Sequence, residues 1–96
     1  MFEFSEEECV VDSLALAIQK WPRAADAWEH ITWVLSKSPK EGAPLNETGD
    51  LRLLIFAGAK SIGMPDIRLI YRIENPTLRL LDVEFTESAY GQAGHA

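Results

Sequence analysis

The chain has 96 residues, 47% of them hydrophobic, and carries 15 acidic against 9 basic residues, which gives a formal net charge of −6. This length supports one domain with a modest core, and the composition excludes extensive disorder. No apolar run approaches the roughly 20 residues of a membrane-spanning helix, and the acidic residues 1–8 lack the basic region of a signal peptide. We therefore expect a cytoplasmic protein without a membrane segment, and the charge disfavours a surface that binds nucleic acid throughout.

The N-terminal half predicts a short strand followed by a helical hairpin. Residues 2–4 alternate as an edge strand would, and Ser5 to Glu8 is typical of a capping box at the start of a helix. Apolar residues at helical spacing predict a first helix to about Lys20 and a second helix from Pro22 to about Lys37. Because the junction between them is short, the two helices should pack as an antiparallel pair.

The C-terminal half predicts a meander of three strands. Residues 38–50 are rich in turn-forming residues and predict a long loop, and strand-like runs follow at 51–57, 66–74 and 78–85. The predicted fold class is α+β, with the short strand and the helical hairpin packed on a three- to four-stranded antiparallel sheet. We expect a single domain over residues 1–90 and a flexible C-terminal tail at residues 91–96.

Alternation within these strands predicts which side chains face the helices. The helix-facing set is Leu51, Leu53, Ile55, Ile67, Leu69, Tyr71, Ile73, Leu81, Val83 and Phe85. The other set, which should face solvent, is Arg52, Leu54, Phe56, Arg68, Ile70, Arg72, Leu78, Leu80, Asp82 and Glu84. This second set is too apolar for a fully hydrated face, so Leu54, Phe56 and Ile70 are predicted to contact a partner. That partner is another protein, a second copy in a homodimer, or the C-terminal segment.

The motifs of common enzymes are missing from the sequence. There is no glycine-rich phosphate loop, no C-x-x-C, no H-x-x-x-H and no G-x-S-x-G. His30 and His95 have no companions at metal-ligand spacing, so we expect neither a metal nor another cofactor.

The remaining candidates for chemistry are arginines. Arg52 and Arg68 are predicted on adjacent strands of one sheet face, with Arg72 roughly 13 Å further along the strand from Arg68. Guanidinium groups bind phosphates bidentately and can stabilise charge that develops during phosphodiester cleavage. Cross-strand ion pairs with Asp82 or Glu84 are the alternative interpretation, and it is the simpler one.

Several segments carry a resemblance to a known family when they are taken in order. They are residues 33–39, 41–45 and 50–54, the strand Ile67-Arg-Leu-Ile-Tyr-Arg-Ile73, the strand at 80–85, and Tyr90 beyond it. In this order and spacing the chain resembles the RelE/ParE superfamily of bacterial toxin–antitoxin modules. The resemblance implies a toxin component that is neutralised by a partner antitoxin protein.

The resemblance also implies candidate site residues. In the ribonuclease branch, toxins enter the ribosome and cut messenger RNA, and this branch implies catalytic roles for Arg52, Arg68 and Tyr90. We add Arg72 as a candidate RNA-binding residue. Where family members often carry a basic pair before the tyrosine, this chain has Glu84-Phe-Thr-Glu87. A ParE-like gyrase inhibitor and a non-catalytic binding or oligomerisation module therefore stay open beside the endoribonuclease.

Overall fold

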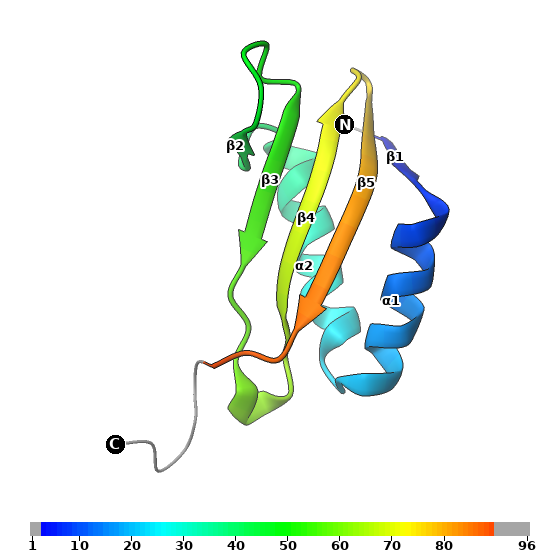
Figure 1. Ribbon diagram of the computed structural model, residues 1–96, viewed down its shortest axis with the longest axis vertical. Coiled ribbons are helices and arrows are strands. Elements are labelled where there is room, and N and C mark those ends of the chain that lie inside the picture. Colours follow the sequence, from blue (N-terminus) through cyan, green and yellow to red (C-terminus); the bar gives the residue numbers. More distant parts are fainter. Residues whose placement is uncertain (1–2, 90–96) are drawn as a thin grey trace.

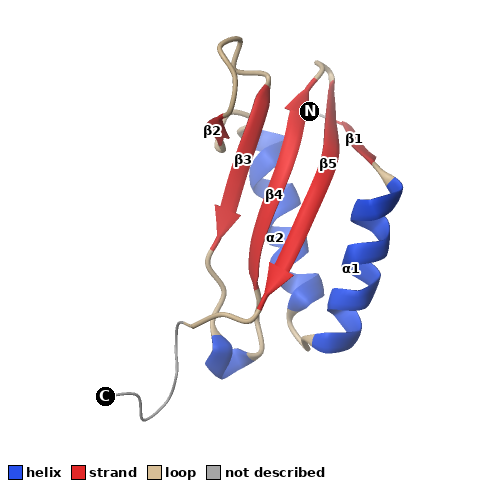
Figure 2. Ribbon diagram, viewed as in Figure 1, coloured by secondary structure: helices blue, strands red, loops and turns tan. Residues whose placement is uncertain are grey.

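In the computed structural model, which describes residues 3–89, two helices pack on one face of a five-stranded sheet (Figure 1). The elements are β1 (Glu3–Glu6), α1 (Glu8–Lys20), α2 (Ala24–Lys37), β2 (Ala43–Pro44), β3 (Leu51–Phe56), the 3-10 helix η1 (Lys60–Ile62), β4 (Asp66–Ile73) and β5 (Thr77–Thr86). The strand order is β1-β5-β4-β3-β2, and Figure 2 shows α2 behind this sheet and α1 alongside β5. The predicted α+β class is confirmed. Neither helix is long and apolar enough to cross a membrane.

The sheet differs from the prediction of three to four antiparallel strands, because it has five strands and is mixed. β1 pairs with β5 in parallel, with Phe4 opposite Leu78. No tight hairpin connects these two strands, so nothing local forces them to be antiparallel. β2 lies within the segment predicted as a loop and pairs with β3 through Ala43 and Pro44. A proline, which has no N–H to donate, is tolerated there because β2 is an edge strand.

The helical hairpin forms as its apolar spacing predicts. On α2, Ala24, Ala27, Trp28, Ile31 and Leu35 recur every three or four residues, and all five are buried. The predicted capping box at the start of α1 is wrong. Ser5 belongs to β1, and the N-cap residue, Glu7, makes no side-chain capping hydrogen bond.

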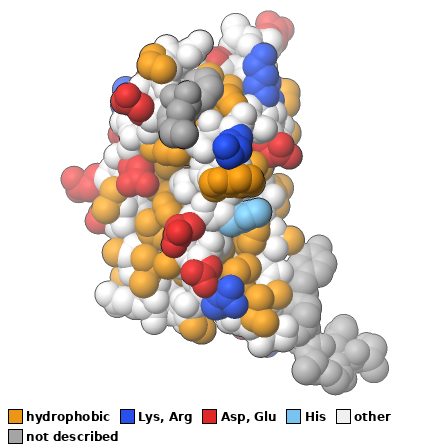
Figure 3. Space-filling view, turned by 180° about the vertical axis from the view of Figure 1, so that it is seen from behind, with side chains coloured by type: hydrophobic (Ala, Val, Ile, Leu, Met, Phe, Trp, Pro, Cys, Tyr) orange, Lys and Arg blue, Asp and Glu red, His pale blue; other side chains and the backbone are white. Residues whose placement is uncertain are grey.

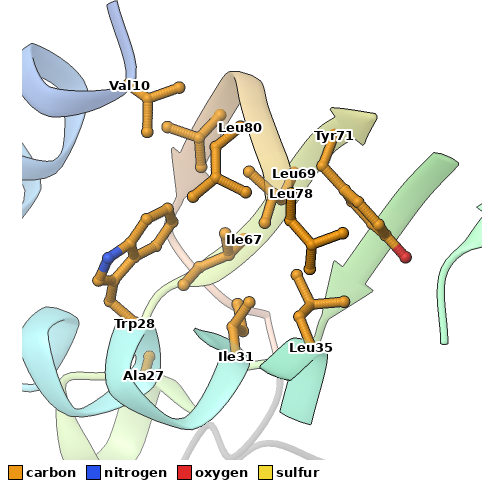
Figure 4. Packing of buried hydrophobic residues seen from close by; sticks show 11 residues of the cluster. Val10, Ala27, Trp28, Ile31, Leu35, Ile67, Leu69, Tyr71, Leu78 and Leu80 are labelled. Carbon is orange, nitrogen blue, oxygen red and sulfur yellow. The ribbon is translucent and has the colours of Figure 1, made fainter. Parts of the chain in front are cut away.

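The core lies between α2 and the middle of the sheet (Figure 4). Ile67, Leu69 and Tyr71 of β4 are fully buried, as their alternation predicted. Figure 4 shows Trp28, Ile31 and Leu35 of α2 directed toward these strands. Burial of apolar surface contributes roughly 25 cal/mol per Å², so the burial of this cluster is the main contribution that holds the helices to the sheet.

A β-bulge corrects the predicted faces of β5. Ile70 pairs with Asp82 and Tyr71 pairs with Leu80, so Leu81 has no partner on β4. The extra residue changes the alternation at that point. Leu78 and Leu80, predicted to face solvent, are therefore fully buried against the helices. Beyond the bulge the prediction holds for Val83, which is also buried.

The predicted faces of β3 are inverted. Arg52, Leu54 and Phe56 lie opposite Tyr71, Leu69 and Ile67, which face the helices. The other set is Leu51, Leu53 and Ile55, and it lies on the opposite side of the sheet, where Ile55 is 64% exposed. Both faces of this strand are apolar in sequence, so alternation alone could not choose between them. Figure 1 shows α2 behind β4, and Leu54 and Phe56 on the neighbouring strand β3 are only partly buried.

The hydroxyl group of Tyr71 joins the sheet to the loop that follows α2. It donates a hydrogen bond to the Pro39 carbonyl at 2.6 Å and accepts one from the Gly42 amide at 3.0 Å. A Cβ atom at Gly42 would lie only 2.8 Å from the Tyr71 oxygen and from the Leu53 carbonyl oxygen, so a larger residue does not fit there. Burial raises the pKa of Tyr71, so the phenol stays protonated and able to donate at neutral pH.

The substitution Tyr71→Phe tests this connection. It should lower the free energy of unfolding by about 1–3 kcal/mol, because it leaves the Pro39 carbonyl and the Gly42 amide without their partner. Urea denaturation of both proteins measures the difference. An unchanged midpoint with an unchanged slope would show that water replaces the phenol without loss.

Candidate functional site

The open face of the sheet is the side that the helices do not cover, and it is turned toward the reader in Figure 1. Three adjacent strands contribute to it: Leu51, Leu53 and Ile55 from β3, Arg68, Ile70 and Arg72 from β4, and Arg79, Asp82 and Glu84 from β5. The strand register aligns Ile55, Arg68 and Glu84 in one row, and Leu53, Ile70 and Asp82 in the next. The face thus runs from acidic at β5 through basic at β4 to apolar at β3.

The two arginines of β4 on this face are each placed beside a carboxylate. Arg68 Nη1 lies 3.9 Å from Glu84 Oε1, and both side chains are more than half exposed. Arg72 Nε lies 3.3 Å from Asp50 Oδ2, although the alignment is too poor for a hydrogen bond. Arg68 and Arg72 were predicted on the solvent side of the sheet, and this placement is confirmed.

The carboxylate that faces Arg72 is held in its charged form. Hydrogen bonds from Thr48 and Asn46 lower the pKa of Asp50, and the charge of Arg72 lowers it further. Asp50 is therefore ionised at neutral pH and remains available to neutralise Arg72.

Arg79 on β5 is paired still more closely. Its Nε donates to Glu74 Oε2 and its Nη1 donates to Glu7 Oε2, both at 3.0 Å. These hydrogen bonds raise the pKa of Arg79, so its charge is fixed. The positive charge on the open face is thus matched by nearby negative charge.

Arg52 is not part of the open face, which corrects the predicted pairing of Arg52 with Arg68. It lies on the helix-covered side and makes hydrogen bonds to three backbone carbonyls. Nε donates to Gly49 at 2.7 Å, and Nη1 donates to Gly42 at 2.7 Å and to Lys40 at 3.1 Å. Arg52 therefore holds the loop before β3 in place.

Two of the three predicted interface residues are also on the other side of the sheet. Leu54 and Phe56 pack against the core, and Ile70 alone lies on the open face. Leu54 and Phe56 line a groove of about 190 Å³ between α2 and β3, where the rings of His30 and Phe56 are 5.7 Å apart. Tyr90, the remaining predicted catalytic residue, lies outside the described residues.

A hollow in the open face brings apolar, basic and acidic side chains together. It has a volume of about 190 Å³ and is lined by Leu53, Arg68, Ile70, Asp82 and Glu84. Asp82 forms no ion pair with any other residue of the described range 3–89, and its Oδ1 accepts a hydrogen bond from the Val83 amide at 3.0 Å. Sequence reasoning placed Asp82 only as a partner for an arginine, because the bulge that aligns it with Ile70 has no clear signal in the sequence.

The described surface has no candidate metal site. Across residues 3–89, no group of three or more histidine, cysteine, aspartate or glutamate side chains could hold a metal ion. Figure 3 shows the helix-covered side, where basic and acidic side chains are interspersed among hydrophobic ones. No protein-family model matches the chain, and no curated protein matches it.

A pair of substitutions separates the structural arginine from the surface arginine. Arg52→Ala should lower the free energy of unfolding by roughly 1–3 kcal/mol, because three carbonyls lose a charged donor. Arg68→Ala should change it by no more than about 0.5 kcal/mol, because an exposed pair at this distance contributes little. Urea denaturation measures both. Equal losses of unfolding free energy in the two variants would contradict the assignment of a structural role to Arg52 and a surface position to Arg68.

Proposed function

We propose that this chain is the toxin component of a type II toxin–antitoxin module of the RelE/ParE type, and that it acts by binding a protein target through the open face. The observation that favours protein binding over RNA cleavage is that each arginine of this face lies within ion-pair distance of a carboxylate. A guanidinium group that is already neutralised attracts a phosphate only weakly.

The order of elements supports the toxin part of the proposal. A helical hairpin followed by an antiparallel meander, β3-β4-β5, is what the resemblance implies. Leu51, Leu53 and Ile55 of β3 support the binding part, since they are apolar, no helix covers them, and Ile55 is 64% exposed. A gyrase-type target and a neutralising antitoxin would both be proteins that such a face can engage.

The second candidate is a ribosome-dependent endoribonuclease, and a specific observation favours it. Arg68 is the third residue of β4, its side chain is 58% exposed, and it lies 3.9 Å from Glu84, which is too far for a hydrogen bond. It could therefore turn toward a scissile phosphate, with Arg72 positioning the RNA backbone. The acidic net charge of −6 opposes this candidate, because the ribosome is a dense phosphate surface.

Growth arrest on induced expression distinguishes the two candidates. If the open face binds a protein, Ile55→Ser should relieve the arrest, while Ile62→Ser, a matched change of an exposed isoleucine on η1, should leave it intact. If the protein cleaves RNA, Arg68→Ala should reduce cleavage by about 10²–10³. In that case Glu84→Gln, which frees Arg68, should increase cleavage.

Thermal melts of each variant control for loss of folding. Protein binding predicts arrest by the parent chain, relief by Ile55→Ser, and retention of arrest by Arg68→Ala and Ile62→Ser. Relief of arrest by Arg68→Ala, together with stronger cleavage in Glu84→Gln, would establish the ribonuclease instead. If induced expression of the parent chain does not slow growth, the toxin proposal is wrong.

A further inference from the structure

The hollow of the open face combines an apolar floor with an acidic rim. Leu53 and Ile70 are partly exposed neighbours on β3 and β4, and Asp82 lies beside Ile70 on β5. Leu53, Ile70 and Asp82 share one row, and that row contains no cation. The row therefore offers apolar contact at Leu53 and Ile70 and, at Asp82, a carboxylate that forms no ion pair within residues 3–89.

The charge of the hollow favours a cationic occupant. Of its five lining residues, Asp82 and Glu84 are acidic and Arg68 is basic, and the Arg68–Glu84 contact of 3.9 Å is loose enough to yield to a better donor. The chain as a whole carries a charge of −6, so the long-range field also attracts cations. A phosphate in the same place would lie beside two carboxylates.

The apolar floor narrows the choice of cation. A small inorganic ion gains nothing from Leu53 and Ile70, whereas a long basic side chain can pack its methylene groups on them and keep its head at the carboxylates. Arginine suits the rim better than lysine because its planar guanidinium can bond two carboxylates at once. Arginine is also enriched among residues that dominate protein interfaces.

We propose that this hollow binds an arginine side chain of the protein partner, with the methylene stem on Leu53 and Ile70 and the guanidinium between Asp82 and Glu84. The inference rests on the proposed function, because it names the chemistry of the partner that the open face takes. The proposed ligand is a cation, whereas a phosphate site would bind an anion. The incoming guanidinium then takes Glu84 from Arg68, whose contact with that carboxylate is long at 3.9 Å.

A peptide titration tests the inference without knowledge of the partner. The probe is a synthetic peptide with one arginine between two leucines and blocked ends, added to the ¹⁵N-labelled protein. The amide signals of Leu53, Ile70 and Asp82 should shift in a saturable manner. The same peptide with neutral citrulline in place of arginine is the control, and it should bind at least about threefold more weakly because it cannot form the ion pair.

Matched variants of the protein locate the binding site. Asp82→Asn should weaken binding of the arginine peptide by about three- to fivefold, as expected for a partly exposed ion pair. Asp12→Asn, which neutralises an exposed acid on α1, should leave the affinity unchanged. Both variants keep the shape of the side chain, and their NMR spectra report whether the fold is intact.

Several outcomes would overturn the inference. They are equal binding of the citrulline peptide, equal weakening by both variants, absence of saturable shifts, or shifts of the same signals by a short single-stranded RNA. A mass that doubles with protein concentration in sedimentation, and falls back in Asp82→Asn, would assign the hollow to a second copy of the chain. If the titration fails while Ile55→Ser still relieves growth arrest, only the arginine assignment is lost and the protein-binding function stands.

Discussion

The pairing register of β4 with its two neighbours is the constraint on which the rest of the structure depends. β4 places Ile67, Leu69 and Tyr71 against α2, and each neighbouring strand must present its apolar residues to the same side. On β5 this requires an unpaired residue at Leu81, because the alternation that buries Leu80 would otherwise expose Val83. A slip of one residue would move every side chain of a strand to the other face.

The same register determines what the open face can do. It places Glu84 opposite Arg68 and Asp82 opposite Ile70, so negative charge enters the centre of a face that would otherwise be basic and apolar. Arg52, which could have added a cation, lies on the other face and bonds backbone carbonyls. This compensation of charge is the reason for proposing contact with a protein and not with phosphates, since a binding face for RNA needs uncompensated positive charge.

The sequence predicts the buried face of a helix or strand only where apolar and polar positions along that element differ clearly. On α2 and β4 the apolar and polar positions differ clearly, and both buried faces were predicted correctly. On β3 every position from Leu51 to Phe56 except Arg52 is apolar, so the choice of face was arbitrary without knowledge of the pairing. The bulge on β5, the parallel pairing of β1 and the two-residue β2 arise from contacts distant in sequence, which periodicity does not record.

The residues of the candidate site were also predicted correctly only on the strand whose apolar and polar positions alternate clearly. Arg68, Ile70 and Arg72 were placed correctly because β4 alternates, whereas Arg52, Leu54 and Phe56 were misplaced because β3 does not. The hollow required both neighbouring registers at once, since it joins Leu53 of β3 to Asp82 of β5 across Ile70. Such a site is a property of the assembled sheet and of no single segment.

The most direct test of this account is a set of methyl contacts measured by NMR in the uniformly ¹³C-labelled protein. The pairing of Leu53 with Ile70 predicts nuclear Overhauser effects between their methyl groups on the open face. It also predicts contacts of Leu54 with Ile31 and Val34 of α2 on the other side of the sheet. Contacts of Leu54 with Ile70, together with contacts of Leu53 with α2, would show the opposite register and would contradict the account.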